Sequence, residues 1–356
     1  MAVNRMSAEP QPGSADRNAW TLPATEEVAT GVYRIPLPMP GDNLKAVNVY
    51  ALEQPDGLTL IDGGWARAEA RAALEIGVQT IGAQLTSIKR ILVTHAHRDH
   101  YTLAVILRRE FGMPIALGAG ERASIEALTS TNANASFGSQ MQLLRGAGAE
   151  KLARIVESQA VYVNPKTDGW EVPDEWLDGG TIEAGGSELK VVPTPGHTRG
   201  HLVFADLGRG LLFSGDHVLP HITPSIGLET VASPSPLTSF LASLALVRTL
   251  PDLRLLPAHG PVAASSHTRV DELVTHHDRR LAEIGEAVST LGEHPALPIA
   301  RQLGWTRHRR HFDELDVFNQ MLAVGETIAH LDVLIRSGLV RERAEGELTL
   351  YSAVSS

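Results

Sequence analysis

The stretch 94–100, Thr-His-Ala-His-Arg-Asp-His, places four metal-binding side chains within six residues. It follows a β-type stretch that ends in Ile91, Leu92 and Val93, so it begins where a buried strand ends. Side chains two positions apart on an extended chain point the same way, and His95 and His97 can therefore bind one cation together. Where the chain turns into a helix, Asp99 and His100 can reach a second cation. The stretch predicts a metal centre at the edge of a sheet.

Three further side chains of the same chemistry follow β-type runs later in the sequence. They are His197, Asp216 and His259, and a small residue or a proline stands shortly before each. Because all three stand at boundaries between a strand and a loop, we expect them at the same edge as the stretch 94–100. Imidazole and carboxylate groups complete sites for zinc, iron or manganese without sulfur.

These motifs resemble the metallo-β-lactamase-fold hydrolase superfamily, in which HxHxDH is followed by separate His, Asp and His ligands. The resemblance covers roughly residues 27–265. It implies an α/β fold, the αββα sandwich, and two metal ions, zinc with iron or manganese as alternatives. By resemblance, the first metal is held by His95, His97 and His197, the second by Asp99, His100 and His259, and Asp216 bridges them.

The resemblance also gives roles in stabilising the site and in catalysis. Asp62, which precedes two glycines, matches the aspartate that braces the ligand loops in this family, and an ordinary Asp-Gly turn is the alternative. Asp99 and Asp216 are the expected catalytic residues. A hydroxide shared by the two metals would attack a carbonyl, because metal-bound water loses its proton near neutral pH, and Asp99 or a bound water would relay the proton. The predicted reaction is the hydrolysis of an ester, thioester or lactone.

Departures from the motifs of individual classes within the superfamily exclude several activities. The commonest β-lactamases have a cysteine ligand and no counterpart of His100, and the flavodiiron enzymes have an acid at position 97. The interval between Asp216 and His259 is too short for the inserted domain of the end-processing nucleases. Glyoxalase II-like thioesterases, lactonases and endoribonucleases with a winged helix remain. Few cations beyond Arg98 and Arg199 stand near the motifs to receive glutathione, which weakens a strict glyoxalase II assignment.

The sequence divides into three parts with one insertion. Residues 1–19 are polar and we expect a disordered tail, whereas 20–268 form the catalytic domain. The irregular segment 129–177 within it is expected to be a lid or substrate pocket. Residues 269–356 give three helices and a hairpin, the order of a winged helix, and we expect this small domain beside the active-site mouth or at a homodimer surface.

Four residues are candidates for substrate contacts. His221 and Thr223 follow Asp216 closely and are expected at the substrate entrance, although a turn built on prolines explains them too. Met141 and Trp170 belong to the insertion and are expected in an apolar wall for an acyl or aromatic group. Packing in a core is the alternative interpretation for both.

Composition excludes several classes of protein. The chain has no cysteine, and 31 Lys and Arg stand against 41 Asp and Glu, a net charge of −10. Generic binding to nucleic acid is disfavoured, also because residues 276–356 carry more acids than arginines, so we expect a small-molecule substrate. There is no apolar run of the length of a signal peptide or membrane span, and we expect a cytoplasmic protein.

Three alternatives to the hydrolase remain open. The first is an endoribonuclease of the metallo-β-lactamase type, which the winged-helix order of elements favours. A mononuclear iron enzyme, similar to persulfide dioxygenases, is the second. The third is a metal-binding protein without catalysis, which is disfavoured because six or seven ligands shared by two metals leave open positions.

Overall fold

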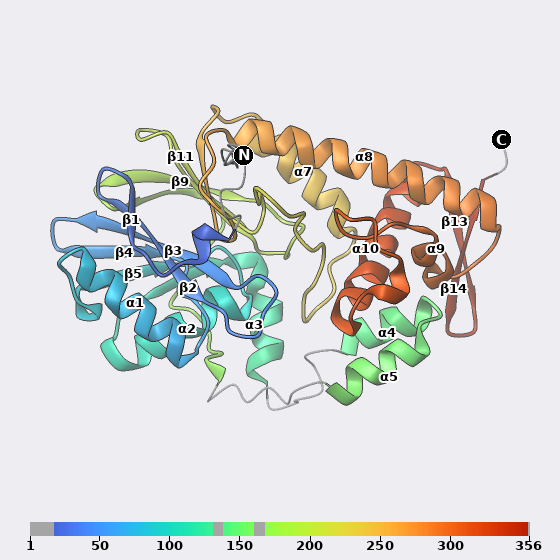
Figure 1. Ribbon diagram of the computed structural model, residues 1–356, viewed down its shortest axis with the longest axis horizontal. Helices are drawn as coiled ribbons and strands as arrows, with labels where there is room; N and C mark the ends of the chain where they lie inside the picture. Colours follow the sequence, from blue (N-terminus) through green and yellow to red (C-terminus); the bar gives the residue numbers. More distant parts are fainter. Residues whose placement is uncertain (1–17, 131–137, 160–167, 355–356) are drawn as a thin grey trace, which may run out of the picture.

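The computed structural model describes residues 18–130, 138–159 and 168–354 (Figure 1). The tail expected at 1–19 lies almost wholly outside the described residues, which begin just before a short 3-10 helix, η1 (Ala19–Thr21). Part of the insertion 129–177 also lies outside them.

The first sheet contains seven strands in the order of the sequence, β1-β2-β3-β4-β5-β6-β7. Strands β1 to β4 pair antiparallel, and β4 to β7 pair parallel. Parallel strands are usually covered on both faces. In β5 this holds for Ile88, Ile91 and Leu92, which are buried, whereas Lys89 is exposed and Arg90 half-buried, so the strand is not the continuous apolar run expected from the sequence. The bounds are β1 (Glu26–Ala29), β2 (Val32–Pro38), β3 (Ala46–Gln54), β4 (Gly57–Ile61), β5 (Ile88–Leu92), β6 (Ile115–Gly118) and β7 (Glu175–Leu177).

The second sheet contains five strands in the order β12-β11-β10-β9-β8. Its strands pair antiparallel except for β11 and β12, which are parallel. The strands β9, β11 and β12 therefore run in the same direction, and the loops that follow them leave at one edge. The bounds are β8 (Gly180–Ala184), β9 (Ser187–Pro193), β10 (Leu202–Asp206), β11 (Leu211–Gly215) and β12 (Arg254–Pro257).

The two sheets face each other between layers of helices. The helices α1 (Ala68–Thr80) and α2 (Arg98–Phe111) cover the outer face of the first sheet, and α7 (Pro236–Arg248) covers the outer face of the second (Figure 1). Between the sheets, Tyr50 meets Phe213 edge to face, with ring centroids 5.3 Å apart, in an apolar core. This arrangement confirms the αββα sandwich.

A helical unit follows the second sheet. It contains α8 (Ser266–Leu291), α9 (Ala296–Gln302), α10 (Val317–Arg336) and the hairpin β13 (Val340–Glu345) and β14 (Leu348–Ala353). This is the expected order of elements, and the winged-helix assignment itself stays a prediction. The helix α8 begins three residues before the expected Arg269 because the Ser265 hydroxyl accepts the Thr268 N–H and caps it.

Two helices of the insertion join the helical unit, which corrects their expected place in the catalytic domain. Its helices α4 (Gly138–Gly146) and α5 (Glu150–Gln159) lie beside α10 and β14 (Figure 1). Met141, Leu144 and Ala153 are buried in one core with side chains of α8, α9 and α10. We call α4, α5 and residues 266–354 the helical unit. An amphipathic helix shows that it needs a core but not which core, so the boundary at 269 could not be placed from local pattern.

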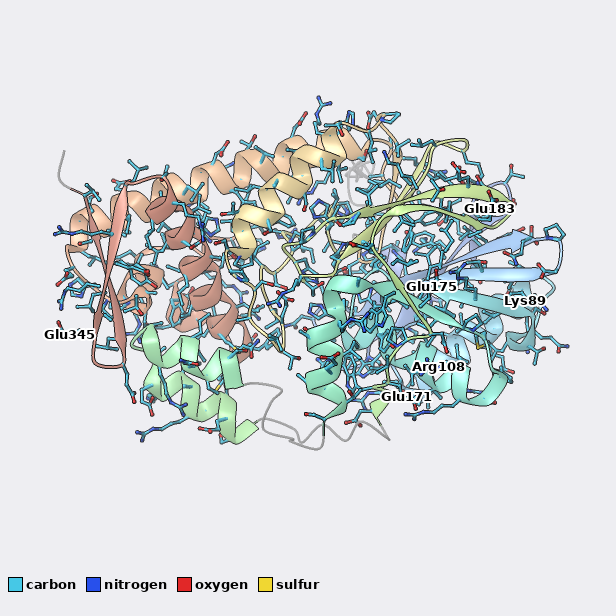
Figure 2. All side chains as sticks on the ribbon, turned by 180° about the vertical axis from the view of Figure 1, so that it is seen from behind. Lys89, Arg108, Glu171, Glu175, Glu183 and Glu345 are labelled. Atoms are coloured by element: carbon cyan, nitrogen blue, oxygen red, sulfur yellow. The ribbon has the colours of Figure 1, made fainter. Side chains whose placement is uncertain are left out.

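The chain returns from the insertion along α2. Trp170 stacks on Tyr101, with ring centroids 6.0 Å apart, and the Tyr101 hydroxyl donates to the carbonyl of Glu171 at 2.7 Å. The guanidinium of Arg108 forms ion pairs with the carboxylates of Glu171 and Asp174, and Figure 2 shows Arg108 and Glu171 side by side. These contacts hold the returning segment against the first sheet's helix layer.

Candidate metal centre

The seven predicted ligands lie together at one edge of the sandwich. The stretch 94–100 follows β5, and His197, Asp216 and His259 follow β9, β11 and β12. Their nitrogen and oxygen atoms form two neighbouring groups. The first group is His95, His97, His197 and Asp216, and the second is Asp99, His100 and His259.

The atoms of the first group are spaced as ligands of one ion. Nε2 of His197 lies 3.2 Å from Nε2 of His95 and 3.1 Å from Nδ1 of His97. It lies 3.4 Å from Oδ2 of Asp216. Bonds of about 2.0 to 2.1 Å from a tetrahedral zinc ion put neighbouring ligand atoms about 3.3 Å apart. The first group fits that geometry.

Asp216 joins the first group to the second. Its other oxygen, Oδ1, lies 3.4 Å from Nε2 of His259 and 3.7 Å from Nε2 of His100. Oδ2 of Asp99 lies 3.2 Å from the same nitrogen of His259 and 3.6 Å from that of His100. One carboxylate therefore presents an oxygen to each group, as a bridging ligand does.

Three buried ligand atoms have no hydrogen-bond partner among the described residues. They are Nε2 of His100, Nε2 of His259 and Oδ1 of Asp216. Leaving a buried polar atom unpaired costs about 1 to 3 kcal/mol, so such atoms are rare without a reason. All three belong to the second group or to the bridge, and a bound cation accounts for them. The donor set, imidazole with carboxylate, suits zinc, iron or manganese.

Backbone carbonyls set the tautomers of three ligand histidines. Nδ1 of His197 donates to the carbonyl of Ser225 at 2.7 Å, and Nδ1 of His259 donates to that of Ala46 at 2.8 Å. In His97 the donor is Nε2, which lies 2.8 Å from the carbonyl of Leu228. A carbonyl only accepts, so each ring has its proton on the outer nitrogen and its lone pair turned to the centre.

Asp62 lies between β4 and the stretch 94–100. Its Oδ1 accepts the backbone N–H of Thr94 at 2.8 Å, and its Oδ2 lies 2.9 Å from Nδ1 of His100. Its backbone is left-handed, with φ of 64°, a conformation that aspartate tolerates better than most residues. The carboxylate thus contacts a candidate ligand ring and the strand end together, and the bracing role that the resemblance implied stays a prediction.

Electrostatics favour neutral His95 and His197 and a charged Asp99, as metal binding needs, whereas the nearby carboxylates favour the protonated forms of His100 and His259. Burial lowers the pKa of His197 to about 3, and burial with the neighbouring histidines lowers that of His95 as well. Burial raises the pKa of Asp99, but His100 and His259 outweigh it and hold this pKa below its usual range. Burial also disfavours charged His100, yet the carboxylates of Asp62, Asp99 and Asp216 raise its pKa to about 10. A cation at this position would replace that proton.

His201 holds the backbone of Asp216. No role was assigned to it from the sequence. It is buried, its Nε2 accepts the backbone N–H of Asp216 at 3.1 Å, and its Nδ1 lies 2.8 Å from the Thr194 hydroxyl. The sequence feature that could have pointed to His201 is its position four residues after His197, at the start of an apolar run.

Glu121 is a second residue that the sequence did not point to. It is 1% exposed and accepts hydrogen bonds from the Thr198 hydroxyl and from the backbone N–H groups of Ala96 and Gly200. A Cβ at Gly200 would lie 2.2 Å from the backbone nitrogen of Glu121, so glycine permits this close approach. Glu121 therefore links the loops that carry His97 and His197. Nothing local in the sequence marks it.

The four candidates for substrate contacts lie in different surroundings. Met141 is 5% exposed in the core of the helical unit, and Trp170 is 8% exposed against Tyr101, so these two are core residues and not a substrate wall. His221 is exposed and Thr223 is half-buried. The latter two stay predictions.

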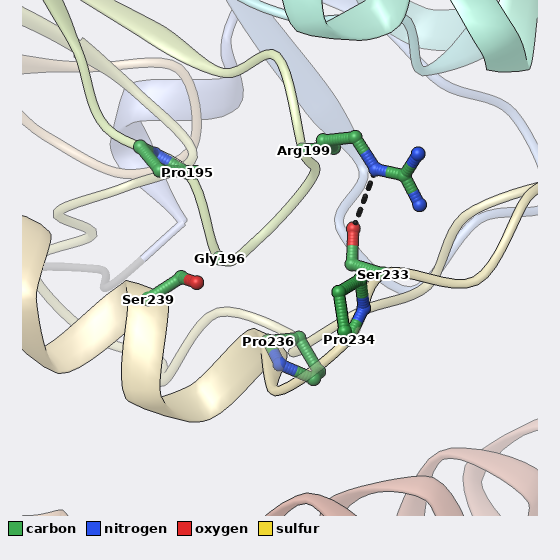
Figure 3. Close-up of a pocket in the computed structure, with 7 residues that line it drawn as sticks. All are labelled: Pro195, Gly196, Arg199, Ser233, Pro234, Pro236 and Ser239. Carbon is green, nitrogen blue, oxygen red and sulfur yellow. Dashed lines mark hydrogen bonds between the residues drawn. The ribbon is translucent and has the colours of Figure 1, made fainter.

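A cavity of about 290 Å³ lies beside the loop that carries His197 (Figure 3). Arg199 lines it, but its guanidinium donates to the Ser233 hydroxyl at 3.0 Å and to the Ala232 carbonyl at 2.6 Å. Arg199 thus holds the segment before α7. The lining residues are Pro195, Gly196, Arg199, Ser233, Pro234, Pro236 and Ser239.

Comparison with known families identifies the class. The family model of the metallo-beta-lactamase superfamily matches residues 42–259, which include all seven ligands. The chain belongs to this superfamily, and the expectation of a metal-dependent hydrolase of this class is confirmed.

Two curated relatives differ in how much of the chain they match. The probable metallo-hydrolase YqjP of Bacillus subtilis (strain 168) is 25% identical over 350 residues, 93% of this chain and 99% of that protein. A Beta-lactamase-like protein 2 homolog of Caenorhabditis elegans is 32% identical over 117 residues, 33% of this chain and 36% of that protein. The chain thus spans about a third of one relative and almost all of the other.

Two solved structures share the architecture. A metallo-beta-lactamase family protein from Thermus thermophilus is 28% identical, with a TM-score of 0.74, and the match covers 92% of this chain and all of that one. A Beta-lactamase domain protein from Burkholderia ambifaria is 26% identical, with a TM-score of 0.75, over 93% of this chain and 95% of that one. Both likenesses extend beyond residues 42–259. Within the described residues, no helix has the length and apolarity to cross a membrane.

Proposed function

We propose that this protein is a dinuclear metal hydrolase, with zinc as the favoured metal, that cleaves an ester, thioester or lactone. The observation that carries the proposal is the position of Asp216, whose two carboxylate oxygens face the two ligand groups separately. A site for one metal needs no such residue. Two bound divalent ions supply an activated water at neutral pH and polarise the carbonyl of the substrate.

The chain's own residues prepare this chemistry. Asp99 is charged near neutral pH, because His100 and His259 lower its pKa, and it is a proton acceptor at the second group. The carbonyls of Ser225, Leu228 and Ala46 hold the outer protons of three ligand histidines and keep their lone pairs inward. The site therefore needs little rearrangement when the metals bind.

The names of relatives support hydrolysis at a carbonyl. Besides the probable metallo-hydrolase of Bacillus subtilis, an Atrochrysone carboxyl ACP thioesterase of Aspergillus fumigatus is 27% identical over 114 residues. Those residues are 32% of this chain and 25% of that enzyme, so the likeness concerns only part of each protein. Thioesters are accordingly the first of the three substrate classes to test.

The test is a hydrolysis panel with metal analysis of the same preparation. Thioesters, lactones, aryl esters, a cephalosporin reporter and a short RNA are assayed before and after treatment with a chelator. We expect one carbonyl class to be cleaved, the activity to disappear with the metal, and added zinc to restore it. Cleavage of RNA alone, or one iron per chain without hydrolysis of any carbonyl, contradicts the proposal.

A further inference from the structure

The segment 225–230 touches the outer side of the first ligand group. The Ser225 carbonyl accepts the hydrogen bond of His197, and the Leu228 carbonyl accepts that of His97, at 2.7 and 2.8 Å. Two of the three histidines of the first group therefore depend on this one segment for their tautomer and ring orientation.

The helix α4 holds the same segment from the opposite side. The Ser139 hydroxyl donates to the carbonyl of Thr230 at 3.0 Å, and the side-chain amide of Gln140 donates to the carbonyl of Glu229. These contacts join the inserted helices to the backbone next to the metal centre.

Leu228 joins the two units within one residue. Its carbonyl accepts from His97, while its side chain packs against the core that α4, α5 and the three C-terminal helices share. The carboxylate of Glu229 adds a second link, because it accepts the backbone N–H of Arg199, two residues after His197, at 2.8 Å. Movement of the helical unit would therefore reach both histidines.

The outer contacts of the second group come from the sandwich alone in the described residues. His100 is held by Asp62, after β4, and His259 by the carbonyl of Ala46, in β3. Among these contacts, the helical unit is therefore connected to the first ligand group and not to the second.

We infer that α4 and the segment 225–230 are a positioning device, through which the helical unit sets the affinity of the first metal site. Gln140 and Leu228 are its positioning residues. The inference rests on the two metal groups of the proposed function but not on hydrolysis. A protein that bound both metals and cleaved nothing in the panel would still test it.

The experiment measures metal affinity, with cobalt(II) as the probe. The metal-free protein is titrated with cobalt in competition with a chelator, and the visible absorption of the bound ion reports the geometry of each site. The variants are Gln140→Ala and Leu228→Ala. The matched control is Gln142→Ala, which removes an exposed glutamine from the same helix. A His259→Ala background leaves only the first group intact and assigns its affinity.

We expect Gln140→Ala and Leu228→Ala to weaken the first site about tenfold, the lower end of the range for residues that orient ligands, and to change its cobalt spectrum. The second site and the control should stay within about twofold of the native protein, far below that range. Native affinity of the first site in both variants overturns the inference, and so does an equal loss at both sites. Circular dichroism and the thermal midpoint show whether each variant folds, and Gln140→Ala decides alone if the Leu228 variant does not.

Discussion

Asp216 has its position between the two ligand groups because neighbouring residues fix its backbone. His201 accepts its N–H, and the left-handed Gly215 before it, with φ of 50°, turns the strand end toward the centre. A Cβ at Gly215 would lie 2.7 Å from Nε2 of His201, so the two residues pack too closely for any other side chain. The bridging position thus depends on local contacts that do not involve the metals.

Asp62 gives a prediction at the scale of single residues. Asp62→Ala removes the acceptor that orients His100 and leaves the Thr94 N–H unpaired. We expect the second site to lose about 10-fold to 100-fold in metal affinity, measured by cobalt titration, because residues that orient a ligand have effects of that size. Asp56→Ala, at an exposed turn, is the control and should bind both metals normally. Native affinity at both sites in the Asp62 variant refutes the bracing role.

Glu121 predicts a dependence of stability on pH. Burial raises its pKa to about 7 in the folded protein, above the ordinary value of 4.5. The folded state therefore binds the extra proton between these values, and the free energy of unfolding falls as the pH rises from about 4.5 to 7. Glu121→Gln removes this contribution.

The measurement for Glu121 is urea unfolding of the metal-free protein at several pH values. From pH 5.5 to 7.5 the variant should gain about 2 kcal/mol of unfolding free energy relative to the native chain, since one pKa unit corresponds to about 1.4 kcal/mol. A difference between the two proteins that stays constant with pH contradicts a raised pKa.

At the scale of elements, a pair of buried histidines joins α8 to α10. Nδ1 of His277 lies 3.1 Å from Nε2 of His330, and both rings are fully buried. Burial lowers the pKa of both, that of His330 to about 4, and the charges of Arg280 and His276 nearby lower that of His277 further. The folded state thus excludes protons that the unfolded chain takes up below pH 6.5.

The histidine pair predicts acid sensitivity of the helical unit. A lowered folded pKa contributes stability that is present above pH 6.5 and is lost as the pH falls toward 4. In the metal-free protein, each histidine should contribute up to about 1.4 kcal/mol per pH unit to this loss. Replacement of both by glutamine should flatten the pH profile of urea unfolding, whereas His308→Gln, at an exposed position, should not. An unchanged acid slope in the double variant is the contrary outcome.

The elements also show where prediction from sequence stops. The helices α8, α9 and α10 and the hairpin could be predicted because their periodicity, caps and turn residues are local. The packing partner of α4 could not be predicted, because its apolar face fits the core of either unit. Met141 and Trp170 were interpreted as a substrate wall for the same reason: an apolar side chain does not encode its partner.

At the scale of the whole molecule, the ligands were predictable and their supports were not. Each ligand follows a β-type run, and the C-terminal ends of these strands converge in the sandwich, so the motifs alone placed all seven together. His201 and Glu121 act on loops that only the fold brings near. The link from Gln140 to His97 joins the helical unit to the metal centre, although the sequence suggested that both residues belonged to the catalytic domain.

Among the described residues, the molecule consists of a sandwich that carries both candidate ligand groups and a helical unit that contacts the surroundings of the first group. Figure 1 shows α8 running from the sandwich along the helical unit, beside α10. Asp216 lies between the two ligand groups, and both proposed metal sites and the proposed hydrolysis depend on it.

The most direct test of that claim is elemental analysis of the native chain and of Asp216→Asn after dialysis against a metal-free buffer. We expect about two divalent metal ions per native chain, as two-metal hydrolases hold, and about one or fewer in the variant, with its hydrolysis lost. The amide fills the same space but presents only one good acceptor oxygen to the two groups. Two metals and full activity in Asp216→Asn, or a single metal in the native chain, would contradict the bridged site.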